Sequence, residues 1–163
     1  MSVSRLLPDA ALPAFAYVPG RQPRPAHGHV VEHASPREQF AWGLDLFNHG
    51  YYWEAHEAWE VLWTKSRKGT RRRMLLKGLI LLAAAGVKVR QGKPDAMVRH
   101  AARAESIFLT LASASGAGRV LGLCPTTLAG DAEVVKSRGG ASVPAIDDCS
   151  VVFAFALRPI DRT

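Results

Sequence analysis

The chain has 163 residues, of which 48% are hydrophobic and 21% are charged. This length suits one domain with an ordinary core, and the composition excludes wholesale disorder, collagen-like repeats and a disulfide-built scaffold. A formal charge of +7 is compatible with an acidic partner without naming one.

Two further observations concern the compartment. The longest apolar run, residues 78–87, is about half as long as a bilayer crossing needs, so we expect no membrane segment. Cys124 and Cys149 lack the spacing of a zinc site, and we interpret them as reduced thiols. The sequence therefore predicts a cytoplasmic protein.

Residues 1–34 are predicted to form an extended N-terminal arm. Five prolines and two glycines in this segment disfavour both helices and sheet ladders. Four apolar side chains of the arm favour its docking on the core: Leu12, Phe15, Tyr17 and Val18.

A helical core domain is predicted over residues 35–114. Ser35-Pro36-Arg37-Glu38 predicts a helix start, because the hydroxyl and the carboxylate can bind free amide groups and proline suits the first helical position. Asn48-His49-Gly50 predicts the end of that helix, since Gly50 can adopt positive φ. Three more helices are predicted over residues 52–65, 71–90 and 94–113. Short joints imply antiparallel neighbours, so the expected fold is all-α, with four main helices in two antiparallel hairpins.

Residues 115–163 are predicted to form a loop-rich tail that packs on the core. Residues 125–136 indicate a short helix within it. Residues 151–157 are an apolar, β-prone run, which we expect to cover an edge of the helical core because one strand alone has no ladder partner.

The second predicted helix carries the residues most indicative of a site. At about 100° per residue, its polar side chains share a third of the circumference, and small and apolar residues lie opposite. The polar stripe consists of Trp53, His56, Glu57 and Glu60, beside Glu54. Tryptophans at its margins favour a partly dry carboxylate strip over an open solvent face.

The charges around this helix predict its partners. Residues 35–63 hold five acids against one arginine, whereas residues 65–77 hold seven bases and no acid. A short turn would fold the bases back beside the carboxylates. We therefore expect the glutamates to pair, shielded from water, with Arg71, Arg72 and Arg73.

Two other functions use the same residues. His56-Glu57-Ala58-Trp59-Glu60 is an H-E-x-x-E, in which His56 and Glu60 would hold a divalent metal such as zinc and Glu57 would act as base of a metal-assisted hydrolase. A third metal ligand is not identified. The basic turn, residues 65–73, could bind nucleic acid or phosphate. Neighbouring glutamates are expected to neutralise half of its positive charge, and this disfavours nucleic acid.

Residues 47–63, followed by Gly78-Leu79-Ile80 and Ala83-Ala84, resemble the family called domain of unknown function 309. The family pattern reads F-N-x-G-x-Y-[FW]-E-A-H-E-x-[LW]-E-x-x-W, then G-L-I-Q in the next helix, and the likeness spans roughly residues 12–111. The resemblance implies a compact all-helical domain without an established activity. It also implies that Glu54, His56, Glu57 and Glu60 are the polar signature of the family, with no assigned task.

Two positions depart from the family pattern. Leu81 stands where the family tends to have glutamine, and Arg24 stands where the arm often has histidine before proline. A polar cluster built from those groups is therefore incomplete in this chain.

These observations predict a non-catalytic helical interaction or scaffold module with a Glu/His/Arg polar cluster. The expected partner is a protein, and no cofactor is expected. The prediction depends on the aromatic-rich helices, on a repeat that relates residues 50–62 to residues 92–104, and on the incomplete catalytic constellation.

Overall fold

The computed structural model describes residues 3–25, 32–114, 116, 118–140 and 150–160. Within these ranges five α-helices follow one another, and a short 3-10 helix, η1 (Arg138–Gly140), ends the series. The α-helices are α1 (Pro36–Asn48), α2 (Tyr52–Lys65), α3 (Arg71–Arg90), α4 (Pro94–Ser113) and α5 (Pro125–Ser137). The described residues form isolated β-bridges but no strand, so the predicted all-α class is confirmed.

The first and third helices begin at side-chain caps. The Ser35 hydroxyl accepts a hydrogen bond from the Glu38 amide at 3.1 Å, and Pro36 occupies the first turn. The Thr70 hydroxyl accepts one from the Arg73 amide at 3.2 Å. Such caps bind amides that the helix itself leaves free, which is why local sequence predicted these boundaries.

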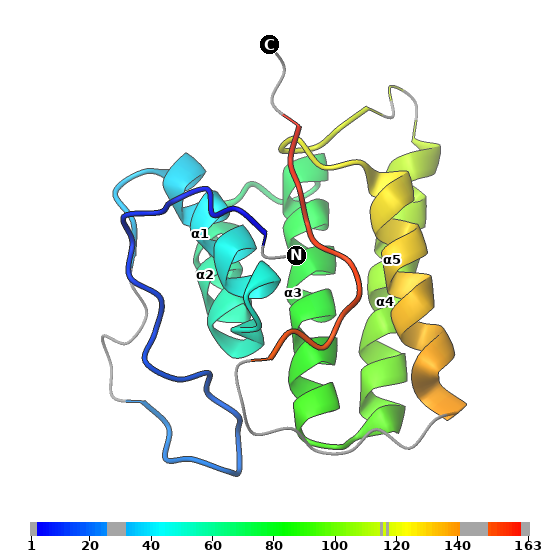
Figure 1. Cartoon of the computed structure of the whole chain (residues 1–163). Helices are drawn as coiled ribbons and strands as arrows, with labels where there is room; N and C mark the ends of the chain where they lie inside the picture. The colour runs from blue at the N-terminus through cyan, green and yellow to red at the C-terminus, as the bar shows by residue number, and fades with distance from the viewer. Residues whose placement is uncertain (1–2, 26–31, 115, 117, 141–149, 161–163) are drawn as a thin grey trace.

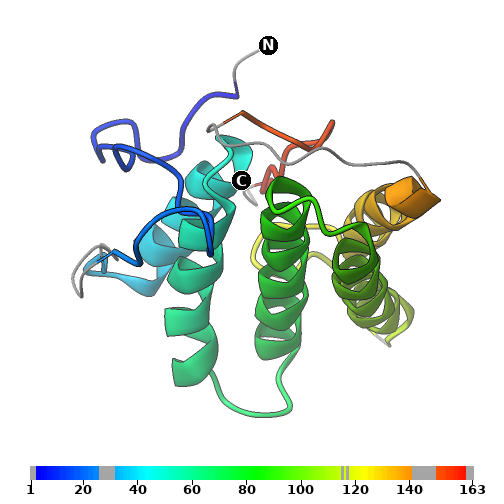
Figure 2. The same ribbon diagram turned by 90° about the horizontal axis from the view of Figure 1, so that it is seen from below.

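Each helix packs against the next one along the chain (Figures 1 and 2). The α2 and α3 helices run antiparallel, because Trp63 near the end of α2 lies against Arg73, whereas Tyr52 at its start lies against Gly86. The fifth helix, α5, packs on α4 and lies in the segment predicted as a loop-rich tail. It is as long as α1, so the series has one more full helix than the four main helices expected.

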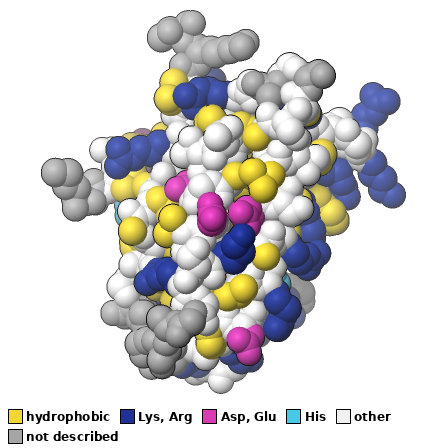
Figure 3. Space-filling view, turned by 90° about the vertical axis from the view of Figure 1, so that its right-hand side faces the viewer, with side chains coloured by type: hydrophobic (Ala, Val, Ile, Leu, Met, Phe, Trp, Pro, Cys, Tyr) yellow, Lys and Arg dark blue, Asp and Glu magenta, His cyan; other side chains and the backbone are white. Residues whose placement is uncertain are grey.

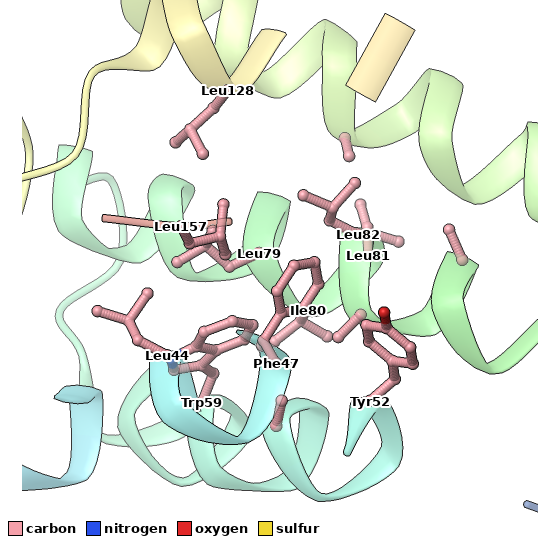
Figure 4. Close-up of a cluster of buried hydrophobic side chains, with 14 of the residues drawn as sticks. Leu44, Phe47, Tyr52, Trp59, Leu79, Ile80, Leu81, Leu82, Leu128 and Leu157 are labelled. Carbon is pink, nitrogen blue, oxygen red and sulfur yellow. The ribbon is translucent and has the colours of Figure 1, made fainter. Parts of the chain in front are cut away.

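The core lies between the helices and the C-terminal segment. Figure 4 shows side chains from α1, α2, α3, α5 and the tail meeting there, including Phe47, Trp59, Leu79 and Leu157. Trp59 is fully buried, and its indole N–H donates to the Phe40 carbonyl at 3.4 Å. None of the described helices combines the length and the apolar character needed to cross a lipid bilayer.

The tail run at residues 151–157 covers this core in front of α3 (Figure 1). Phe153 and Leu157 are buried, and Phe153 stacks on Phe47 with ring centres 5.7 Å apart. The Asn48 side chain accepts from the Leu157 amide at 2.8 Å and donates to the Leu157 carbonyl at 2.9 Å. As predicted, the run covers the helices instead of pairing in a sheet, and a side-chain amide supplies the hydrogen bonds that a neighbouring strand would give.

Close packing of α2 on α3 depends on a glycine, which gives a first testable prediction. A Cβ atom at Gly86 would lie 2.5 Å from Cγ of the buried Tyr52 ring. We expect Gly86→Ala to lower the free energy of unfolding by about 1 to 3 kcal/mol through overpacking, measured by urea denaturation. Gly130 of α5 is the matched control, since nothing lies within 4 Å of its added Cβ. Gly130→Ala is expected to stabilise the protein by up to about 1 kcal/mol, and equal losses in both variants would contradict the packing argument.

Candidate functional site

Glu54, in the first turn of α2, is a buried carboxylate that holds the N-terminal arm. Its Oε1 accepts a hydrogen bond from the Tyr17 amide at 2.8 Å, and the side chain is 6% exposed. The Tyr17 ring meets the Trp53 ring edge-on at 5.1 Å. Burial raises the pKa of Glu54 to about 7, although the Tyr17 N–H donor opposes this shift. The carboxylate is therefore partly protonated near neutral pH.

Arg90, at the end of α3, has a buried guanidinium that links the turn before α2 to the C-terminal tail. It is 1% exposed, and it donates to the Gly50 carbonyl in the turn before α2 and to the Ser150 carbonyl of the tail, the latter at 2.6 Å. Its guanidinium carbon lies 4.7 Å from the centre of the Tyr52 ring, a cation–π geometry. Arg90 was not among the predicted site residues, although an arginine near the end of an apolar helix is a visible signal in the sequence.

His56 stacks on Trp53 along the exposed margin of α2, with ring centres 5.6 Å apart. Its Nδ1 is buried without a hydrogen-bond partner among the described residues. Burial lowers the pKa of His56, and the neighbouring carboxylate of Glu60 opposes the shift. On α4, burial and then the charge of Lys88 lower the pKa of His100. Both shifts favour the neutral form of the imidazole.

His56 and Glu60 were the predicted ligands of the metal alternative. Zinc sites use at least three protein ligands, and no group of three His, Cys, Asp or Glu side chains with suitable geometry occurs in the described part of the chain. Glu60 is exposed and Glu57 is half-buried. The donors present in these residues do not fit a zinc ion, and we derive no step through one.

The arginines at the start of α3 do not meet the glutamates of α2, which corrects the expected pairing. Arg73 donates to the Trp63 and Ser66 carbonyls and lies over the Trp63 ring at 4.0 Å. Arg71 donates to three carbonyls around the end of α4, including that of Gly116 at 3.0 Å. The cause is register: antiparallel packing sets the start of α3 beside the end of α2, about 14 Å along the axis from Glu54.

A cavity of about 1180 Å³ lies at the start of α3, and we name it the arginine groove. It is bounded by the arm, the first turns of α1 and α3, the loop before α5 and the end of the tail. Its lining residues are Leu6, Leu7, Ser35, Pro36, Arg37, Glu38, Phe40, Ala41, Leu44, Arg71, Arg72, Gly116, Gly118, Arg119, Leu121, Gly122, Pro159 and Ile160. This groove was not predicted from the sequence, because five distant segments build it and no single motif marks it.

Comparison with protein families gives one finding that bears on this geometry. The family model described as Domain of unknown function (DUF309) matches residues 40–100. The match contains all of α2 and α3, and with them Glu54, His56 and Arg90. Comparison with curated proteins and with solved structures gives no match. Residues 40–100 of this chain are therefore similar to the family Domain of unknown function (DUF309).

Proposed function

We propose that the protein is a non-catalytic helical interaction module, with the arginine groove as its binding face. One observation supports this most directly: every buried polar or charged side chain among the described residues binds main-chain atoms. These side chains are Gln39, Asp45, Asn48, Glu54 and Arg90. Buried polar groups used in this way fix chain segments in place instead of facing a substrate.

The Asp45 carboxylate illustrates this use. Its two oxygens accept from the Leu6 and Leu7 amides, each at 2.8 Å, so α1 holds the part of the arm that walls the groove. At the other wall, the Ile160 amide donates to the Gly122 carbonyl at 3.0 Å. A concave surface fixed from several sides is suited to binding a partner, because little order is lost on association.

Site-specific photocrosslinking in cells tests this proposal. A photoreactive phenylalanine analogue replaces Leu6, which is 45% exposed in the groove, or Leu109, which is 53% exposed on α4. We expect a discrete crosslinked product from position 6 that position 109 does not give. The absence of a product at position 6, or the same product at both positions, would contradict the module.

The metal-assisted enzyme is separated from the module by elemental analysis. Protein purified without chelator is expected to carry less than one zinc ion per chain, and zinc addition is expected to leave its melting temperature unchanged. A stoichiometric ion that is lost in the His56→Ala variant would instead support metal-assisted chemistry.

We also propose that the module works in the cytoplasm. The thiol of Cys124 is free, as expected where thiols stay reduced, whereas Cys149 lies outside the described residues. Labelling of Cys124 with a maleimide in intact cells, compared before and after chemical reduction, would test the compartment.

A further inference from the structure

The arginine groove has a strongly basic wall. Four arginines and a single glutamate are among its lining residues: Arg37, Arg71, Arg72, Arg119 and Glu38. The amino ends of α1 and α3 also border it, and the positive end of each helix dipole adds to the field. The groove therefore favours a negatively charged occupant.

Two of these arginines differ in how they are held. Arg71 is fixed by carbonyls of Leu111, Gly116 and Gly118, so it serves as part of the wall. Arg72 is half-buried in the lining and has no hydrogen-bond or ion-pair partner within the described ranges. Arg119 is exposed and donates one hydrogen bond, to the Gly122 carbonyl at 3.3 Å. Both Arg72 and Arg119 retain donors for an added carboxylate.

The rest of the lining is apolar and largely aliphatic. Leu6 and Ile160 are 45% and 56% exposed and supply accessible apolar surface, whereas Phe40 and Leu44 are buried. The volume of about 1180 Å³ exceeds the roughly 300–1,000 Å³ of an ordinary small-molecule site. A peptide with both carboxylates and branched apolar side chains matches the size and the two kinds of lining.

We propose that the arginine groove binds an acidic segment of a partner protein, whose carboxylates meet Arg72 and Arg119 and whose leucine-like side chains lie against Leu6 and Ile160. This inference rests on the proposed function and names the chemistry of its partner. A single-stranded nucleic acid fits less well, because such strands bind along basic tracks with exposed aromatic rings for base stacking, and the one aromatic ring in the lining, Phe40, is buried.

The surface formed by α4 and α5 provides a comparison. Figure 3 views the molecule from the side where these helices lie, and its acidic side chains lie among basic and apolar ones. Arg99 and Arg103 are exposed on α4 and do not line the groove. Their reversal to glutamate changes the net charge as much as reversal of Arg72 and Arg119, so they form a matched control.

Fluorescence anisotropy of the full chain with labelled peptides tests the inference. The probe is a peptide composed of Glu and Leu residues that is long enough to span the groove. Its comparison peptides have Lys in place of Glu, or Ser in place of Leu. We expect the Glu/Leu peptide to bind, the Lys/Leu peptide not to bind, and the Glu/Ser peptide to bind more weakly. Added salt should weaken the binding, since exposed charge pairs are screened.

The variants give the deciding comparison. Arg72→Glu with Arg119→Glu should raise Kd for the Glu/Leu peptide at least about 10-fold, and Arg99→Glu with Arg103→Glu should leave it within about 2-fold. Equal losses in both double variants, no binding of the Glu/Leu peptide, or tighter binding of a single-stranded oligonucleotide at the same arginines would overturn the inference. A crosslinked product at Leu6 without peptide binding would overturn the acidic ligand while leaving the proposed module in place.

Discussion

Replacement of Arg90 by alanine is expected to lower the free energy of unfolding by about 3 to 5 kcal/mol. The guanidinium is 1% exposed and binds carbonyls of two separate segments, at Gly50 and at Ser150. Alanine would leave both carbonyls without this donor and would remove the cation beside the Tyr52 ring. It would also open a cavity at the end of α3, which adds to the loss.

Urea denaturation measures this loss, and two further variants interpret it. Arg90→Lys keeps the charge, but an ammonium group cannot reproduce the planar fork that reaches both carbonyls, so an intermediate loss is expected. Arg99→Ala, at an exposed position of α4, is expected to change stability by less than about 0.5 kcal/mol. A loss below about 1 kcal/mol for Arg90→Ala would mean that the tail does not depend on this contact.

Replacement of Glu54 by glutamine is expected to remove part of the pH dependence of stability. Burial raises the pKa of Glu54 from its ordinary value of 4.5 to about 7 in the folded protein. The folded state thus binds this proton more tightly than the unfolded chain does. The contribution of Glu54 to the free energy of unfolding is therefore fully present below pH 4.5 and falls by about 3 kcal/mol as the pH rises to 7.

Denaturation of the protein and of Glu54→Gln at pH 5 and at pH 8 measures this effect. Glutamine can still accept the Tyr17 N–H through its amide oxygen, so the arm contact is retained. We expect the free energy of unfolding of the variant, minus that of the original protein, to be larger at pH 8 than at pH 5. Glu133→Gln, at an exposed position of α5, is the matched control and should keep the slope of the original protein. Identical slopes for Glu54→Gln and the original protein would show that the carboxylate is ionised in the fold without penalty.

The helices were predictable because their signals are local. Ser35 caps α1 through its own hydroxyl, and Gly50 takes φ 89° just after α1, so a few neighbouring residues decide each boundary. Core positions such as Ala55 and Trp59 follow from the periodicity of α2 in the same way. The family resemblance read from residues 47–63 was confirmed by the match over residues 40–100.

The predicted partners of the polar strip were wrong, because these contacts depend on the register between helices. The turn after Lys65 places Trp63 against Arg73, and antiparallel packing then places Tyr52, at the start of α2, against Gly86 near the end of α3. The charge pattern alone predicted Arg71–Arg73 as the partners of α2. In the structure, Arg90 is the arginine that lies beside Tyr52 at the start of α2. The acceptor role of Glu54 toward Tyr17 joins segments 37 residues apart, and no periodic pattern encodes such a contact.

Helix α4 fills the space above Gly78 with the ring of Phe108, which lies eight residues beyond the end of the family match. Leu128, Phe153 and Leu157 complete the same core and also lie outside the match. The stretch that matches the family model is thus smaller than the core of the folded protein. A fragment limited to residues 40–100 would lack the Ser35 cap and would end within the first half of α4. Its apolar core residues would then be exposed to water. The family boundaries are therefore unsuitable limits for expressing this protein.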